Sequence, residues 1–309
     1  MNTQRATSHP DRPQADAWPV MVLAHNEERH IAACLDSIFA ADPDRKFQVH
    51  VMANGCTDRT EAIVNDYSRK RPEVHLVSIV LGDKCNAWNV FIHDTVPNSC
   101  SDRDVYFFMD GDATATPGSF SAMARALNQL AEANAASALP FAGRSAASDR
   151  EKMIDEHALV ANLYSLRGSF VRRLAEERVR VPLNLEGDDG LIGMFVKWDL
   201  VPERQPAVEQ RIAVCLDAGF KFELFTPLRP RDWKTYWKRC VRYGRRNYEF
   251  RLLGPWLESR GIAAMPVDIV ELYPQAERLP LRWQGLYTIT NWVALRQMRK
   301  IGRQRTGLA

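Results

Sequence analysis

Short apolar runs alternate with amphipathic segments along the first half of the chain. The predicted strands are residues 19–24, 48–53, 74–80 and 104–109, each bounded by polar or turn-forming residues. Apolar residues recur at helical spacing between and after them, as Ile31, Leu35 and Ile38 do after the first strand. Strand, polar loop and helix therefore alternate, and this order predicts an α/β protein with a right-handed, mostly parallel sheet.

The fourth predicted strand ends in a pair of carboxylates. Residues 104–109 are mostly apolar and lack Gly and Pro, which is typical of a buried central strand, and Asp110-Gly111-Asp112 follows directly. Ligands of open α/β sheets collect at this edge of the sheet. Two carboxylates on a glycine-containing turn suit Mg²⁺ or Mn²⁺ that is held partly by substrate phosphates. Asp-Gly-Asp is also a common turn, so the pair alone leaves both interpretations open.

Polar loops follow the first two strands as well, at His25–Glu28 and Asn54–Asp58. Because the carboxyl ends of parallel strands open on one edge, we expect these loops and Asp110–Asp112 to line one crevice. Asn26 is a natural N-cap for the helix that follows, and the two glutamates after it suit the positive end of that helix.

Composition narrows the class of protein. The 309 residues can bury a large core in one large domain or two small ones, and 46% of them are apolar and 26% charged. The net charge of +3 is too small to argue for a nucleic-acid partner, and we expect none. Six scattered cysteines without C-x-x-C spacing indicate free thiols of a reducing cytoplasm.

The length of the apolar runs bears on whether the chain is exported or spans a membrane. No apolar run reaches the length of a bilayer-spanning helix, and the N-terminus lacks a signal-peptide core. We therefore expect a cytoplasmic protein that is not an integral membrane protein. Residues 1–17 are polar and contain several prolines, which predicts a disordered lead-in.

Four motifs in sequence order resemble the nucleotide-sugar domain of family 2 glycosyltransferases, which are inverting enzymes with the GT-A fold. They are Val22–Glu28, Asn54–Thr60, Gly82–Asn89 and Asp110–Asp112. Each is weak singly, but their order and spacing make them specific together. The resemblance implies a GT-A, Rossmann-like, mostly parallel sheet flanked by helices. The implied divisions are a glycosyltransferase domain at 18–230, its nucleotide-sugar part 18–140, its acceptor part 141–230, and a basic, aromatic helical segment at 231–309.

The resemblance also implies roles for individual residues. Asp112 and Asp110 would hold a divalent metal on the diphosphate of the donor, and the first loop and Asp58 would contact the nucleoside. The residues implied in nucleotide-sugar binding are Ala24, Asn26, Glu28, Asn54, Asp58, Lys84, Asn89, Asp110 and Gly111. Many members carry a further acidic residue where this chain has Gly55-Cys56, so the choice between a UDP and a GDP donor stays open.

A carboxylate-rich stretch later in the chain supplies a candidate base. Residues 186–189 read Glu-Gly-Asp-Asp, at the stage where family members carry a Glu-Asp pair whose Asp acts as the base. The register is open by one residue: aligning Gly190-Leu191 favours Asp189, and counting back from Leu191 favours Asp188. The alternative is that these acidic residues only cap the helix that begins near Asp189.

The chemistry of glycosyl transfer agrees with these assignments. A sugar leaves a nucleoside diphosphate only if the charge that develops on the phosphate is neutralised, and a metal ion and a lysine are the usual means. The attacking hydroxyl, on a glycan or a lipid-linked acceptor, needs a carboxylate base. A nucleotidyltransferase that builds a nucleotide-sugar is the alternative, but such enzymes usually carry a Gly-rich, basic loop where this chain has His25–Glu28.

Residues 229–251 form a strongly basic segment. Read as a helix, the segment carries a basic stripe and an apolar one: Lys234, Lys238, Arg242 and Arg245 form the first, and Trp233, Trp237, Val241 and Tyr248 the second. Arg239–Tyr243 loosely match the Gln-x-x-Arg-Trp motif of processive family members. That match implies that Arg239 and Arg242 bind the diphosphate or an anionic acceptor, and a solvated basic face is the alternative.

The last segment, Arg282–Arg305, contains six basic residues, no acidic ones, and three tryptophan or tyrosine side chains. This composition suits a helix that lies on an anionic membrane, which would place the protein peripherally at the inner face of the membrane. It equally suits a C-terminal helix that packs on the domain by its aromatic side.

Overall fold

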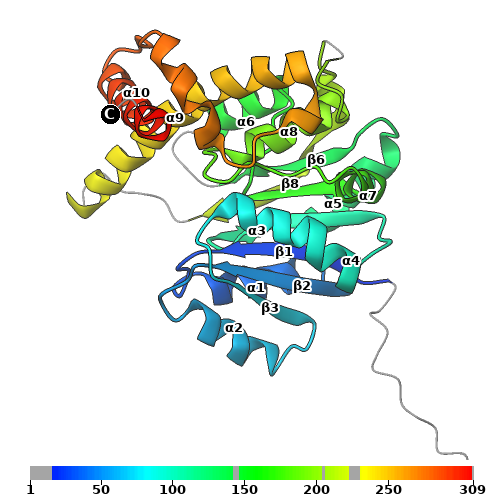
Figure 1. The fold of residues 1–309 in the computed structure, drawn as a ribbon. Coiled ribbons are helices and arrows are strands. Elements are labelled where there is room, and N and C mark those ends of the chain that lie inside the picture. Colours follow the sequence, from blue (N-terminus) through cyan, green and yellow to red (C-terminus); the bar gives the residue numbers. More distant parts are fainter. Residues whose placement is uncertain (1–15, 142–145, 204–205, 223–229, 308–309) are drawn as a thin grey trace, which may run out of the picture.

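An eight-stranded mixed sheet runs through the middle of the molecule, with helices on both of its faces (Figure 1). The computed structural model describes residues 16–141, 146–203, 206–222 and 230–307. Within these residues the strand order is β3-β2-β1-β4-β7-β6-β8-β5. Most of the predicted lead-in and Arg229 of the basic segment lie outside the described residues.

The bounds of the elements are as follows. The strands are β1 (Trp18–Ala24), β2 (Phe47–Asn54), β3 (Val74–Ile79), β4 (Val105–Asp110), β5 (Ala113–Ala115), β6 (Ala135–Pro140), β7 (Leu163–Arg167) and β8 (Ile212–Phe222). The α-helices are α1 (Ile31–Ala41), α2 (Thr60–Ser68), α3 (Lys84–Val90), α4 (Val96–Ser99), α5 (Ser119–Gln129), α6 (Ala146–Asp155), α7 (Gly168–Glu176), α8 (Asp188–Trp198), α9 (Pro230–Arg260) and α10 (Tyr287–Thr306). A π-helical turn, η1 (Phe91–Thr95), and the 3₁₀ segments η2 (Glu209–Arg211), η3 (Ile262–Ala264) and η4 (Ile269–Arg278) complete them.

The first four strands form the parallel half of the sheet. β1 pairs in parallel with both β2 and β4, and β2 pairs in parallel with β3. All four predicted strands are therefore confirmed, as is the predicted fold class. The other half was not foreseen: β7 runs antiparallel to both β4 and β6, β8 pairs in parallel with β6, and β5 runs antiparallel to β8.

Successive side chains of the central strands pack alternately into two hydrophobic cores, one on each face of the sheet. In β4, Phe107 packs into the core that holds α1 and α5, whereas Tyr106 and Phe108 pack into the core that holds α3, α7 and α8. Side chains alternate faces because the period of a strand is two residues. A strand that is apolar at successive positions is stable only when helices cover both faces, and that is the arrangement here.

The helical C-terminal portion lies against the second core. Helices α9 and α10 pack together, and the backbone of α10 approaches η4 closely at Gly302, where a Cβ would lie 2.7 Å from the carbonyl oxygen of Tyr273. Tyr248 of the predicted apolar stripe is fully buried, but Trp233 and Trp237 are 66% and 47% exposed. The prediction of one continuous apolar stripe along this helix is therefore wrong, because the start of α9 extends beyond the core that buries its middle (Figure 1).

Two further expectations concern thiols and the membrane. All six cysteines are free, as their spacing predicts. In the parts of the chain that the structure describes, every helix is too short or too polar to cross a bilayer.

Candidate active site

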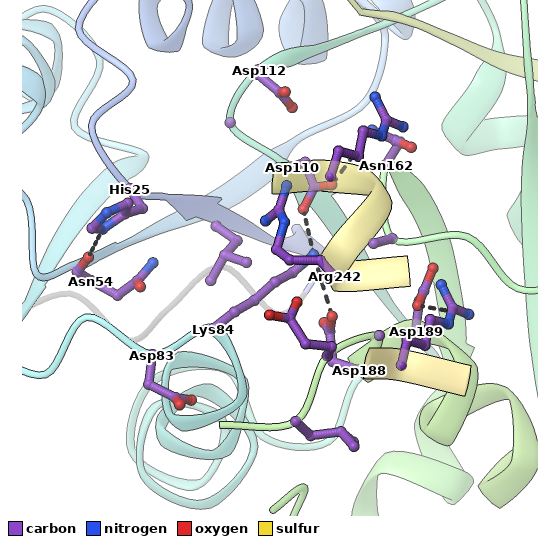
Figure 2. A pocket seen from close by; sticks show the side chains of 18 of the residues that line it. His25, Asn54, Asp83, Lys84, Asp110, Asp112, Asn162, Asp188, Asp189 and Arg242 are labelled. Carbon is purple, nitrogen blue, oxygen red and sulfur yellow. Dashed lines mark hydrogen bonds and ion pairs between the residues drawn. The ribbon is translucent and has the colours of Figure 1, made fainter. Parts of the chain in front are cut away.

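A cavity of about 1100 Å³ opens at the carboxyl ends of β1, β2 and β4 (Figure 2). Its walls come from the loops after these strands, the start of α3, the loop that leads into α8, and α9. The predicted crevice is present: residues from all three strand-end loops line the cavity, namely His25, Glu27, Asn54, Asp110, Gly111 and Asp112.

Backbone contacts fix the strand-end loops against one another. The N–H of Gly111 donates to the carbonyl of Leu23 at 2.8 Å, and a Cβ at position 111 would lie only 2.9 Å from that oxygen. The side-chain amide of Asn54 donates to the carbonyl of Ala24 at 2.9 Å, and the main-chain carbonyl of Asn54 lies 2.6 Å from Nδ1 of His25. These bonds link β4 to β1 and β1 to β2 at the edge where the cavity opens.

The loop after β2 approaches the loop after β3 equally closely. Gly55 has a φ of +58°, and a Cβ there would lie 2.5 Å from the Cα of Gly82. Only glycine adopts this conformation freely and leaves room for the second backbone. The two glycines therefore allow the third motif, which carries Lys84, to meet the first two.

Asp110 and Asp112 concentrate negative charge on one side of the cavity. Asp112 is an exposed residue of the cavity lining, and partial loss of hydration together with the neighbouring Asp110 carboxylate raises its pKa. Burial raises the pKa of Glu27 too, with a further contribution from Asp112. A cation at this point would relieve the repulsion between these carboxylates.

The donor set fits a hard divalent cation that shares its shell with a substrate. Within the described ranges, no group of three or more His, Cys, Asp or Glu side chains converges to hold a metal ion. Asp110 and Asp112 could supply two carboxylates, and Mg²⁺ or Mn²⁺ commonly takes its remaining ligands from phosphates and water.

Lys84, the first residue of α3, connects the two groups of carboxylates in the cavity. Its Nζ lies 3.1 Å from Oδ1 of Asp110 and 3.5 Å from Oδ1 of Asp188, and Figure 2 shows it reaching between them. Burial by itself lowers the pKa of Lys84, but the two carboxylates outweigh burial and hold that pKa above its ordinary value. The ammonium group therefore stays charged at the centre of the cavity.

The two candidate bases stand at the start of α8, after Gly187, which has a φ of +85°. Asp188 is buried, and this burial raises its pKa to about 6 although Lys84 opposes the shift. Asp189 is more exposed; its Oδ1 lies 3.4 Å from Nη2 of Arg246 and accepts the N–H of Gly190 at 2.8 Å. The alternative that these acidic residues only cap the helix does not account for Asp188, because its carboxylate faces Lys84.

Helix α9 supplies the basic wall that faces these carboxylates. Its cavity-lining residues are Thr235, Arg239, Arg242, Tyr243, Arg245 and Arg246. A Cβ on Gly187 or Gly190 would lie 2.5 Å and 2.8 Å from atoms of Arg246, so the loop and the helix are in close contact. The alternative of a solvated basic face fits Lys234 and Lys238, which are exposed and are not among the described residues that line the cavity. Arg239, Arg245 and Arg246 are half-buried in the cavity wall, and Arg242 lines the cavity although it is exposed.

A buried carboxylate that the sequence did not single out holds this wall in place. Glu249 is fully buried; it accepts the hydroxyl of Tyr273 at 2.5 Å and the N–H of Glu186 at 2.8 Å. Burial raises the pKa of Glu249 to about 7. Arg245 forms an ion pair with Glu186 and lies 3.9 Å from Glu249. In the sequence, Glu249 is distinguished only as an acidic residue in a segment that is otherwise almost wholly basic.

Four residues expected at the nucleoside are not among the described residues that line the cavity. They are Ala24, Asn26, Glu28 and Asp58. Hydrogen bonds join three of them, Asn26, Glu28 and Asp58, to one another, and the carbonyl of Ala24 accepts from Asn54. Asp58 accepts the N–H of Thr60 at 2.9 Å and the N–H of Glu28 at 3.0 Å. The bonds from Thr60 and Glu28 hold the pKa of Asp58 below its ordinary value although burial raises it.

Asn26 does not cap α1, contrary to expectation. The helix begins at Ile31, and Asn26 has a φ of +58°. Its Oδ1 accepts the N–H groups of Thr57 and Asp58 at 2.8 Å and 3.3 Å. The side chain therefore ties the first loop to the second, a long-range contact that the local sequence does not reveal.

Asn89 is not brought to the cavity in the described residues. It is buried, and both atoms of its amide bond the backbone of Val181, at 2.8 Å and 2.9 Å. Asn162, which the sequence did not single out, does reach the cavity, where its amide donates to Asp110 at 3.4 Å.

Comparisons with known proteins agree with this architecture. Residues 20–172 match the model of the family described as Glycosyl transferase family 2. Mannosyltransferase PcManGT from Pyrobaculum calidifontis, solved with GDP-Man and Mn²⁺, is 16% identical with a TM-score of 0.54, over 99% of this chain and 79% of that one. Glucosyl-3-phosphoglycerate synthase from Mycobacterium tuberculosis, solved with phosphoglyceric acid, is 15% identical with a TM-score of 0.50, over 77% of this chain and 80% of that one. No curated protein sequence matches the chain.

The likeness to solved structures, at this level of identity, shows a shared GT-A fold, and the fold and the family match together define a glycosyltransferase. Through residues 20–172 the chain belongs to glycosyltransferase family 2, which confirms the resemblance found in its motifs.

Proposed function

We propose that the protein transfers a sugar from a nucleoside-diphosphate sugar to a hydroxyl acceptor, with inversion and with a requirement for Mn²⁺ or Mg²⁺. One observation carries this proposal: Lys84 lies between Asp110 at the strand ends and Asp188 at the start of α8. The residues proposed for the donor diphosphate and those proposed for the acceptor hydroxyl thus occupy one cavity.

Asp110 and Asp112 would hold the metal, with Asp112 as the more direct ligand because Asp110 is already paired with Lys84. When bound, the divalent ion supplies positive charge that stabilises the leaving diphosphate. Lys84 supplies a second positive charge on the same side of the cavity.

The chemical step is a direct displacement at the anomeric carbon. The acceptor oxygen forms a bond to that carbon as the bond to the phosphate oxygen breaks, and the proton of the acceptor hydroxyl passes to a carboxylate. We assign Asp189 as this base, with Asp188 as the alternative, because the alignment of Gly190-Leu191 favours Asp189 and because Asp189 is the more exposed of the two. Partial proton transfer in the transition state suffices, since the hydroxyl becomes acidic only as it attacks.

The remaining assignments concern the two substrates. The nucleoside, of UDP or GDP type, is assigned to the loops that carry Ala24, Asn26, Glu28, Asn54 and Asp58. Arg239 and Arg242 contact the diphosphate or an anionic acceptor, and Gly111 lets the strand-end backbone approach the donor. Asn89 acts by positioning the segment at Val181 rather than by touching the donor.

The acceptor is a glycan or a lipid-linked glycan in polysaccharide biosynthesis. We place the protein in the cytoplasm, with a peripheral contact at the inner face of the membrane.

The experiment is incubation of the protein with a panel of UDP- and GDP-sugars in the presence of Mn²⁺. We expect slow release of nucleoside diphosphate from one donor, and that donor should also raise the thermal unfolding midpoint most strongly. Release of pyrophosphate from a nucleoside triphosphate and a sugar phosphate would favour a nucleotidyltransferase instead. The acidic, glycine-free loop His25–Glu28 speaks against that outcome, because it offers no cradle for a triphosphate.

A further inference from the structure

One end of the molecule exposes a large set of apolar side chains that the proposed chemistry does not use. They come from the first turns of α9 and from the region that opens α10. We call them the aromatic surface: Trp233, Tyr236, Trp237, Tyr243, Trp283, Leu286, Tyr287, Ile289 and Trp292. Leu286 is 89% exposed and Trp283 is 80% exposed. Contiguous apolar surface of this kind marks an interaction site, because single exposed apolar residues are normal and clusters are not.

Contacts between the two helices join these residues into one surface. The hydroxyl groups of Tyr236 on α9 and Tyr287 on α10 lie 3.1 Å apart. Further along, a Cβ on Gly244 would lie 2.9 Å from Oδ1 of Asn291 and 3.3 Å from Cβ of Ala294, so the helices touch there as well. Figure 1 shows α9 and α10 side by side at this end of the molecule. The exposed side chains of Tyr236 and Tyr287 therefore meet where the two helices pack together.

The positive charge around the aromatic surface favours an anionic partner. Residues 233–248 and 282–306 contain no Asp or Glu. Exposed Lys234, Lys238 and Arg242 accompany the aromatic residues of α9, and the guanidinium of Arg296 lies 5.2 Å from the ring centre of Trp292. Tryptophan and tyrosine prefer the boundary between lipid and water, and each basic residue near an anionic bilayer adds roughly 1 kcal/mol of attraction.

The aromatic surface also adjoins the cavity. Tyr243 belongs to both, and Thr235, Arg239 and Arg242 line the cavity from the same helix that carries Tyr236 and Trp237. A bilayer in contact with the aromatic surface would therefore lie beside the part of the cavity that α9 lines.

We propose that the aromatic surface docks on an anionic lipid bilayer and holds the mouth of the cavity at the membrane. The docking itself rests on the exposed side chains and on charge; its consequence, that acceptors reach the cavity from the lipid side, rests on the proposed function. No described helix can cross the bilayer, so the contact is peripheral.

The test is sedimentation of the full chain with vesicles of phosphatidylcholine, with and without phosphatidylglycerol. We expect binding to vesicles that contain phosphatidylglycerol, weaker binding to pure phosphatidylcholine, and a decrease with added salt. The double variant Trp233→Ser/Trp237→Ser should lose about tenfold or more in vesicle affinity. Its release of nucleoside diphosphate from a donor in solution should stay unchanged, because neither side chain lines the cavity in the described residues.

A matched pair of leucine variants keeps the test independent of how well the tryptophan variant folds. Leu286 on the aromatic surface and Leu216 on β8 are both exposed, at 89% and 60%. Leu286→Ser should weaken vesicle binding several-fold, and Leu216→Ser should leave it unchanged.

Three results would overturn the proposal. They are equal affinity for both vesicle types, equal effects of Leu286→Ser and Leu216→Ser, or a self-association in sedimentation velocity that the tryptophan variant abolishes, which would assign the surface to a second copy of the chain. Vesicle binding without any donor turnover would contradict the proposed function but would still support the proposed docking on a bilayer.

Discussion

The two walls of the cavity are built in different ways. The strand-end wall, which carries Asp110 and Asp112, is fixed by main-chain hydrogen bonds such as the one from Gly111 to Leu23. The helical wall of α9 is fixed by side-chain pairs, in which Arg245 holds Glu186 and Arg246 faces Asp189. Main-chain bonds of a sheet depend on strand register, whereas ion pairs depend on where two distant segments meet. The first wall follows from local sequence patterns, and the second follows from the tertiary fold.

The largest effect is expected at the strand-end wall. Asp112→Asn keeps the shape of the side chain but removes its charge, so metal-dependent release of nucleoside diphosphate should be abolished while the fold is retained. Donor turnover and the thermal unfolding midpoint are the measurements. Asp66→Asn, at an exposed carboxylate on α2, serves as the control and should behave as wild type. Wild-type turnover in Asp112→Asn would contradict a role for Asp112 in the reaction.

The loop between the two walls should give the next largest effect. Asp189→Asn should retain donor binding but lose about 10²–10⁴-fold in sugar transfer, the usual size of a general-base contribution. Asp188→Asn is its matched partner, one residue away and facing Lys84 instead of Arg246. If Asp188→Asn loses transfer and Asp189→Asn does not, the base is Asp188. Full activity in both variants would contradict a base in this loop.

The helical wall can be tested through stability as well as activity. Burial raises the pKa of Glu249 from 4.5 to about 7, so the folded protein keeps this proton over a pH range in which the unfolded chain has lost it. The contribution of the protonated Glu249 carboxyl group to the free energy of unfolding is therefore complete below pH 4.5 and is lost as the pH rises through 7. Glu186, Arg245 and Tyr273 are the charged or titratable groups that contact Glu249.

Glu249→Gln removes this titration. Between pH 5 and pH 8 the wild type should lose about 2.5 kcal/mol of unfolding free energy relative to the variant, since one pKa unit corresponds to about 1.4 kcal/mol. Denaturant unfolding at both pH values measures the difference. Tyr273→Phe retains the carboxyl group and should retain the pH dependence. A pH-independent difference between wild type and Glu249→Gln would show that this carboxyl group does not titrate in the range.

The smallest effect is expected at the junction of the first two strand-end loops. Asp58→Ala removes the acceptor for the N–H groups of Thr60 and Glu28, which should cost about 1 kcal/mol of unfolding free energy. If Asp58 also contacts the nucleoside, binding of nucleoside diphosphate should weaken as well, as calorimetry would measure. Asp58→Asn keeps an acceptor oxygen and should recover much of the stability. Unchanged nucleotide affinity in Asp58→Ala would limit this residue to a structural role.

The same contrast explains what the sequence could and could not predict. The strands of the parallel half and the shared edge of their loops were predictable, because each depends on a local apolar run and on the common direction of the strands. The antiparallel insertion of β7 between β4 and β6 was not, because no local pattern records which strand lies beside which.

Individual side chains of the site divide in the same way. Asp110 and Asp112 come directly after a predicted strand, so their position at the cavity followed from the sequence. Asn26 has the composition of a helix cap but bonds the loop after β2, and Glu249 takes part in the site only because α9 packs on the loop before α8. Trp233 and Trp237 have helical spacing typical of a core stripe, yet they lie beyond the core.

The stereochemistry of the product tests most directly whether the two walls act together in one displacement. With the matching donor and an acceptor, the anomeric configuration of the new glycosidic bond can be read from proton coupling constants. Attack by a hydroxyl that the carboxylate at the start of α8 activates, on the face opposite the departing diphosphate, predicts inversion relative to the donor. A product with retained configuration would contradict that mechanism.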